Sequence, residues 1–165
     1  RGAINKGGLS SAAVIEYGLY SSGSAWKFVV SNGTTFTTVE TTAVSSLTWY
    51  YVLAWHDSTA NTVNIMFNDG TPVSQAHSVG CQDGTGAFYI GAATDGFQFI
   101  GALDEVGFWK RLLTSGEKTY LYNSGAGKTC CPFVKLKNGD RLQYYVFDRP
   151  LRVLHMPAQP QPLKL

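Results

Sequence analysis

Hydrophobic and polar residues alternate in short runs along the first hundred residues of the chain. Residues 13–20 place Ile15 and Leu19 on one face, and residues 24–33 place Trp26 and Phe28 on one face. Because side chains on a strand alternate between its two faces, each run predicts a half-buried β-strand. Glycine-rich turns separate the runs at short intervals. Short strands joined by such turns indicate an antiparallel sandwich or jelly roll.

One run departs from this alternation. Residues 48–57, TWYYVLAWHD, are apolar on both faces, which is typical of a strand buried between two layers. We therefore expect Trp49 and Trp55 in the core, and likewise Trp109. The following run, residues 61–73, alternates again, and the Asp69-Gly70 pair within it favours a tight hairpin turn.

Two more strands are predicted at residues 86–93 and 97–109, with a β-bulge near Gly101 where the alternation shifts. The spacing of the apolar residues then changes from the period of a strand to that of a helix. Thr114 and Glu117 have the spacing of a capping box, which predicts a helix of about two turns ending near Gly125. The predicted fold class is therefore all-β: a two-sheet antiparallel jelly-roll sandwich with one short C-terminal helix.

The end of the chain has a different composition. Residues 129–165 contain five of the six prolines, and residues 134–165 contain six basic and two acidic residues. We expect a domain over residues 1–128, followed by a basic, proline-rich tail over residues 129–165. The tail is predicted to form one hairpin around Asn138 and then an extended segment, and it offers a contact for oligomers. The net charge of +2 is too small to indicate nucleic acid binding.

Composition and motifs argue against several other classes of protein. The three cysteines give neither a disulfide framework nor a zinc motif, and no apolar run could span a bilayer. The histidines belong to no nucleophile motif. The chain begins with Arg1, so we expect it to be a processed or excerpted piece of a protein. The sequence leaves open whether a signal peptide has been removed.

Three segments in order resemble the laminin-G-like, or concanavalin A-like, lectin/glucanase superfamily. Residues 47–73 resemble its W-x-H-V-A…V-x-I-Y-V-N-G strand pair, residues 87–109 its F-x-G-x-I-D-E-V-x-I-W signature, and residues 110–127 its N-R-A-L-S-x-x-E-I helix. The resemblance implies a jelly roll that binds glycans or proteins on a cell surface, on a virion surface or in the extracellular space. It also implies that the family's opening strands are missing here, unless residues 134–147 fill part of the gap.

The acidic pair Asp104 and Glu105 does not predict catalysis. Neighbours on a strand point to opposite faces, whereas the two carboxylates of a glycosidase must flank one bond. The Glu-x-Asp-x-x-Glu motif of the family's glucanases is also absent. We therefore predict that the chain is not an enzyme, and a glucanase fragment is the weaker alternative.

The resemblance leaves two roles open for Asp104, which either accepts hydrogen bonds from backbone amides of the adjoining loop or binds Ca²⁺. In the second case Asp83 and Asp95, which lie in glycine-rich turns, would join it on one rim. Asp is also favoured in turns for its local hydrogen bonds alone. Calcium is the one cofactor that the sequence suggests.

Aromatic residues beside turns are the candidate ligand contacts, because sugars stack their C–H faces on aromatic rings. We expect Tyr20, Trp26, Phe97 and Phe99 to reach solvent, and residues 94–99, which include Asp95, to form the recognition surface. The predicted function is a non-catalytic carbohydrate-binding or lectin-like adhesion module of a larger protein. The alternative is a structural or protein-interaction module, such as a phage decoration or tail domain that contacts capsid protein.

Overall fold

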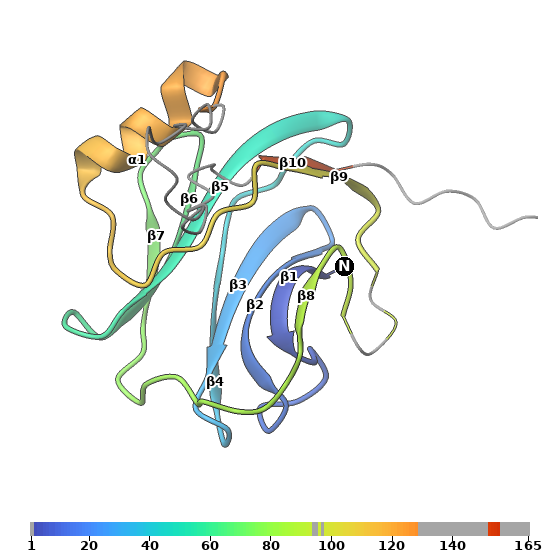
Figure 1. Cartoon of the computed structure of the whole chain (residues 1–165), viewed down its shortest axis with the longest axis vertical. Helices are drawn as coiled ribbons and strands as arrows, with labels where there is room; N and C mark the ends of the chain where they lie inside the picture. Colours follow the sequence, from blue (N-terminus) through green and yellow to red (C-terminus); the bar gives the residue numbers. More distant parts are fainter. Residues whose placement is uncertain (1, 94–95, 97, 129–151, 156–165) are drawn as a thin grey trace, which may run out of the picture.

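The computed structural model describes residues 2–93, 96, 98–128 and 152–155, which form two antiparallel β-sheets and a short helix (Figure 1). The first sheet has the order β4-β3-β2-β1-β8, and the second has the order β7-β6-β5-β10-β9. The predicted fold class, an antiparallel jelly-roll sandwich with one short helix, is confirmed. The strands of the first sheet are β1 (Gly2–Gly7), β2 (Ile15–Ser22), β3 (Ala25–Ser31), β4 (Phe36–Glu40) and β8 (Phe88–Ile90). Those of the second sheet are β5 (Thr48–Asp57), β6 (Thr62–Phe67), β7 (Val73–Ala76), β9 (Gly101–Asp104) and β10 (Arg152–His155).

The main core lies between the two sheets. On β3 and β6 it takes alternate residues, as the hydrophobic pattern predicts. Its members include Leu19, Trp26 and Phe28 from the first sheet, and Val52 and Ile65 from the second. Each removes apolar surface from water, which is the main favourable term in folding. The core therefore fixes which face of every strand is turned inward.

A second, smaller core lies on the other face of β5. Helix α1 (Ser115–Tyr122) packs Leu121 against Tyr51 and Leu53, and Figure 1 shows it over β5 and β6, away from the first sheet. The predicted capping box is confirmed, since Thr114 Oγ1 accepts from the Glu117 N–H and the Glu117 carboxylate accepts from the Thr114 N–H. A 3₁₀ turn, Asn123–Gly125, ends the helical segment. Strand β5 is apolar on both faces because both faces are covered.

The region around β9 differs from the prediction. The long strand expected at residues 97–109 is wrong, since β9 spans only Gly101–Asp104 and Glu105 follows it with a φ of 55°. The bulge expected near Gly101 is also wrong, because β9 pairs with β10 in regular register. In the described part of the chain, β1 and β2 instead show two register shifts, one between Gly2 and Ile4 and one between Lys6 and Gly7.

Part of the predicted tail belongs to the sandwich. Strand β10 lies between β5 and β9, with Arg152 opposite Tyr51 and Asp104. The hairpin predicted around Asn138 lies outside the described residues, and the domain boundary after residue 128 stays a prediction. No helix in the described part of the chain is long and apolar enough to cross a membrane.

Candidate functional site

A β-bulge in β2 shapes the first part of the site. Lys6 is opposite Tyr17 and Gly7 is opposite Ile15, so Glu16 is an extra residue in the ladder. Gly7 has a φ of +76°, in the left-handed region that glycine adopts without strain. Because of the bulge, the Glu16 carboxylate lies next to Lys6 and does not follow the regular alternation of side chains along β2.

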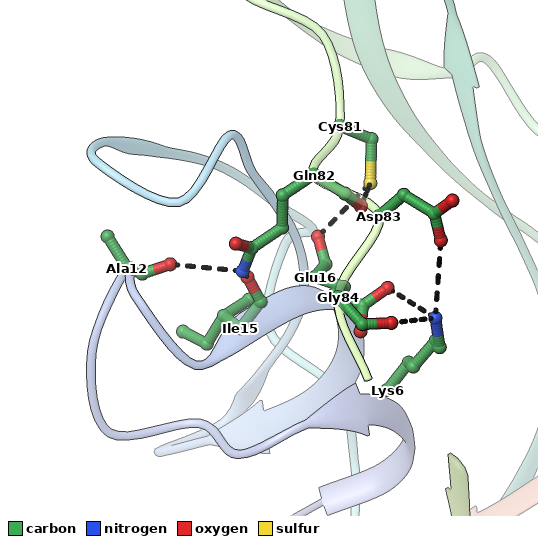
Figure 2. A network of polar contacts seen from close by, with 8 residues as sticks. All are labelled: Lys6, Ala12, Ile15, Glu16, Cys81, Gln82, Asp83 and Gly84. Carbon is green, nitrogen blue, oxygen red and sulfur yellow. Dashed lines mark hydrogen bonds and ion pairs between the residues drawn. The ribbon is translucent and has the colours of Figure 1, made fainter. Parts of the chain in front are cut away.

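A buried ion pair forms at this bulge (Figure 2). The Lys6 Nζ lies 2.6 Å from Glu16 Oε2, donates to the Gly84 carbonyl at 3.0 Å, and lies 3.8 Å from Asp83 Oδ1. Glu16 is only 3% exposed, and its hydrogen bond to Lys6 raises the pKa of the Lys6 ammonium. Because a buried carboxylate is costly without a partner, removing Lys6 would leave an uncompensated charge.

The segment 80–86 lies across this ion pair and is held at several points. The Gln82 side chain donates to the Ala12 and Ile15 carbonyls, and the Gln82 N–H donates to the Ser31 carbonyl at 2.8 Å. At Gly86 a Cβ would lie 2.8 Å from the Gly7 Cα, so the close approach requires glycine there. Segment 80–86 is therefore a fixed wall next to the bulge (Figure 2).

Three aromatic rings next to the bulge form what we call the aromatic cluster: Tyr17, Phe88 and Phe108. Phe108 lies 5.6 Å from Tyr17 and 5.7 Å from Phe88 between ring centroids, the second pair edge to face. Phe108 is 57% exposed and Phe88 is also exposed. Burial of Tyr17 raises the pKa of its phenol, so it stays neutral and can donate a hydrogen bond. The cluster thus offers both apolar ring surface and a polar group.

A cleft of about 500 Å³ opens beside the aromatic cluster. Its volume is in the range of small-molecule sites. The rings of Tyr17 and Phe108 contribute to its wall, and residues 56–59 at the end of β5 contribute polar groups. The Lys118 ammonium, 3.5 Å from the centroid of the Trp55 ring, adds a positive charge. This combination of apolar ring faces and hydrogen-bonding groups suits a sugar, which has both C–H faces and hydroxyls.

The aromatic residues predicted as ligand contacts lie elsewhere. Trp26 is 0% exposed, so its predicted exposure is wrong, and a ring without exposed surface cannot stack on a ligand. Phe99 is half-buried, and the centroid of its ring lies 5.7 Å from that of Trp26. Tyr20 is half-buried opposite Lys27, and none of the three lines the cleft. Phe97 and Asp95 lie outside the described residues, so the recognition surface predicted at residues 94–99 stays a prediction.

The predicted burial of three tryptophans is only partly correct. Trp55 and Trp109 are half-buried against the second core. Trp49 is 45% exposed, so its prediction is wrong. Trp49 occurs near the start of β5, ahead of the part that α1 covers at Tyr51 and Leu53.

The acidic residues predicted as calcium ligands do not converge in the described part of the structure. Asp104 accepts a hydrogen bond from the Glu105 N–H at 2.9 Å, which is the contact expected without a metal. Asp83 is fully exposed and is near the Lys6 ammonium. Among the described residues, no three His, Cys, Asp or Glu side chains gather as a metal site requires. Asp95 lies outside those residues, and calcium binding stays a prediction that a shift in melting temperature on adding EDTA would test.

Sequence reasoning missed Phe108 and Tyr17 as site residues. Both occur in apolar alternation within predicted strands, where apolar side chains are expected to face a core. The signal for Phe108 was its neighbour Trp109, because two large adjacent residues cannot both face one core. In the structure both residues line the cleft, but Trp109 also packs against the second core, whereas Phe108 is 57% exposed.

Comparison with known proteins gives one match. A family model described as the concanavalin A-like lectin/glucanases superfamily matches residues 3–117. No curated protein and no solved structure matches the chain. The matched residues include β1 to β9 and therefore both sheets that form the cleft.

Proposed function

Since the chain belongs to the concanavalin A-like lectin/glucanase superfamily, we propose that it is a non-catalytic carbohydrate-binding module that holds a sugar in the cleft beside Phe108. The observation that carries the proposal is the aromatic cluster at the cleft wall. The module would belong to a larger extracellular, cell-surface or virion-surface protein. The family supports a lectin-like role of this general type.

The exposure of Phe108 and Phe88 supports this proposal. Large apolar side chains that remain exposed side by side mark binding surfaces more often than isolated ones do. A sugar ring stacked on Phe108 would cover apolar ring surface, while its hydroxyls would meet polar groups such as His56, Ser58 and Lys118. Aromatic rings bring a large contact area and little conformational entropy cost to such a site.

The described carboxylates support a non-catalytic role. Glycoside hydrolysis generally uses two carboxyl groups on either side of one bond. Glu16 is buried and paired with Lys6, and Asp104 is exposed and bonded to the next backbone amide. Asp57, at the cleft, accepts hydrogen bonds from the N–H groups of Thr59 and Ala60 in its own turn. These three carboxylates therefore have other partners.

A glycan array followed by titration calorimetry on the best glycan tests the proposal. Phe108→Ala should weaken binding about tenfold or more, equivalent to about 1.4 kcal/mol, because it removes the ring on which the sugar stacks. Phe36→Ala is the matched control, since Phe36 is an equally exposed phenylalanine on β4 that does not line the cleft. Equal affinities of the two variants would rule out the cleft as the sugar site.

A protein-interaction or structural module, such as a phage decoration or tail domain, is the second candidate. It is favoured by β8, an edge strand of the first sheet with Phe88 and Ile90 both exposed, because an apolar edge strand can pair with another chain. Silence on the glycan array together with a concentration-dependent assembly that Ile90→Lys abolishes would support it. Glycan hydrolysis that Asp104→Asn abolishes would instead favour the third alternative, a glucanase fragment.

A further inference from the structure

His77 connects the two sheets of the sandwich at one edge. It follows β7 of the second sheet, and its Nδ1 lies 2.8 Å from the hydroxyl of Thr37 on β4 of the first sheet. Its Nε2 lies 2.7 Å from the Gly80 carbonyl, and its backbone N–H donates to the Asn61 carbonyl at 2.7 Å. The side chain is only 3% exposed. The buried imidazole thus joins β4 to the segment after β7, and the backbone of the same residue is bonded to the β5–β6 turn.

These contacts define the protonation state of the ring. The Gly80 carbonyl can only accept, so Nε2 carries the proton. In the neutral ring Nδ1 is then the acceptor for the Thr37 hydroxyl. A second proton on Nδ1 would make that nitrogen a donor as well and would turn the Thr37 hydroxyl round.

A second histidine lies directly against the first. The rings of His56, near the end of β5, and His77 are 5.1 Å apart between centroids and nearly perpendicular, at 82°. Burial, and then the proximity of His77, lower the pKa of His56 below its ordinary value of 6.5. Since the folded state binds a proton less readily than the unfolded chain, stability is complete above pH 6.5 and is lost as pH falls below it.

The charges around the pair do not compensate for an added proton. The acidic group that acts on His56 is Asp57. Asp57 also acts on Lys118 and accepts two backbone hydrogen bonds in its own turn. The groups bonded to His77, which are the Thr37 hydroxyl and the Gly80 and Asn61 carbonyls, are uncharged.

We propose that His56 and His77 form a pH-sensitive connection between the two sheets, which loosens when the His56 ring takes up a proton beside the ring of His77. The residues released first are those from His77 to Gly80, because the Gly80 carbonyl is bound to the His77 ring, whereas Gln82 keeps its own bonds to Ala12, Ile15 and Ser31. The released segment leads directly into Cys81, which lines the cleft. Mild acid therefore loosens the edge formed by β4 and β7 next to the cleft. The inference goes beyond the proposed function and does not require that a glycan binds.

Urea unfolding of the full chain at about pH 7.5 and about pH 5.5 tests this, in a window where histidine titrates and most carboxylates do not. The unfolding equilibrium constant of the wild type should rise several-fold at the lower pH. His56→Gln should reduce that rise, because it removes the second ring and leaves the hydrogen bonds of His77 in place. His155→Gln, which removes the third histidine of the chain, is the matched control and should keep the full rise.

Two results would overturn the inference: a full rise in His56→Gln, or loss of the rise in His155→Gln. Imidazole NMR titration of the wild type gives a measurement that does not depend on any variant folding. It should show His56 titrating below 6.5, together with faster amide exchange at residues 77–80 in mild acid. Titration of His56 at its ordinary value with unchanged amide exchange would also overturn it.

Discussion

Gly7 is the position at which one added methyl group should cost most. In Gly7→Ala the new Cβ would lie 1.8 Å from the Val14 carbonyl oxygen, and the residue would keep a φ of +76°. The position of a Cβ is fixed by the backbone, and the Val14 oxygen is itself a backbone atom, so no side-chain rotation can relieve the clash. The strand would have to move away, which would break the hydrogen bond from the Gly7 N–H to the Ala87 carbonyl, now 3.0 Å long.

The expected loss of stability has two parts. A left-handed conformation costs a residue other than glycine about 1–2 kcal/mol, and displacement of the backbone adds to this, for a total of about 3–5 kcal/mol. Gly23→Ala is the matched control, because Gly23 has a φ of +62° and no neighbouring atom within 4 Å of the added Cβ. Gly23→Ala should lose only the free energy of the left-handed conformation, about 1–2 kcal/mol.

Urea unfolding of both variants, followed by tryptophan fluorescence, measures the two parts. Gly7→Ala should unfold at a clearly lower urea concentration than Gly23→Ala, with a similar dependence on denaturant. If both variants lost the same free energy, the close approach at the bulge would not be a real constraint.

Three further predictions concern stability. Thr114→Ala should cost about 1 kcal/mol in urea unfolding, because the helix loses its cap, and an unchanged midpoint would contradict this. The hydrogen bonds from Arg111 and then Thr114 lower the pKa of Glu117 to about 2. The contribution of Glu117 to the free energy of unfolding is therefore present above pH 4.5 and is lost as pH falls towards 2. Glu117→Gln should flatten this part of a plot of unfolding free energy against pH. Tyr51→Phe should keep or slightly raise the unfolding midpoint, since the buried Tyr51 hydroxyl has no hydrogen-bond partner in the described structure. A loss above about 1 kcal/mol would show that the hydroxyl has a partner after all.

Alternation along the chain was enough to predict the sandwich, because inward residues recur at every second position on the strands. It also placed β5 between two layers and located the helix cap at Thr114. The error at Trp26 came from weighing its nearness to a turn above its shared face with Phe28, although that shared face was the better guide. The error at Trp49 came from treating β5 as covered along its whole length.

The cleft could not be predicted in the same way. Its wall includes Tyr17, which follows the extra residue Glu16, and a bulge has no period that marks it in the sequence. It also combines Tyr17 with Phe108 and Trp109, which are about ninety positions away along the chain, so that only the packed sheets bring them together. The contact between His56 and His77 joins residues that are 21 positions apart, and a pattern of neighbouring residues does not reveal a contact over that separation.

The layer formed by α1 has a practical consequence for anyone who expresses this domain. The family match stops at residue 117, inside the helix Ser115–Tyr122. A fragment cut at that match boundary would lack Leu121 and would leave Tyr51 and Leu53 facing water. Such a fragment should be poorly soluble and prone to aggregate even though it contains every residue that the family match covers. A usable fragment has to extend through the turn at Gly125 and on to β10, which pairs with both β5 and β9.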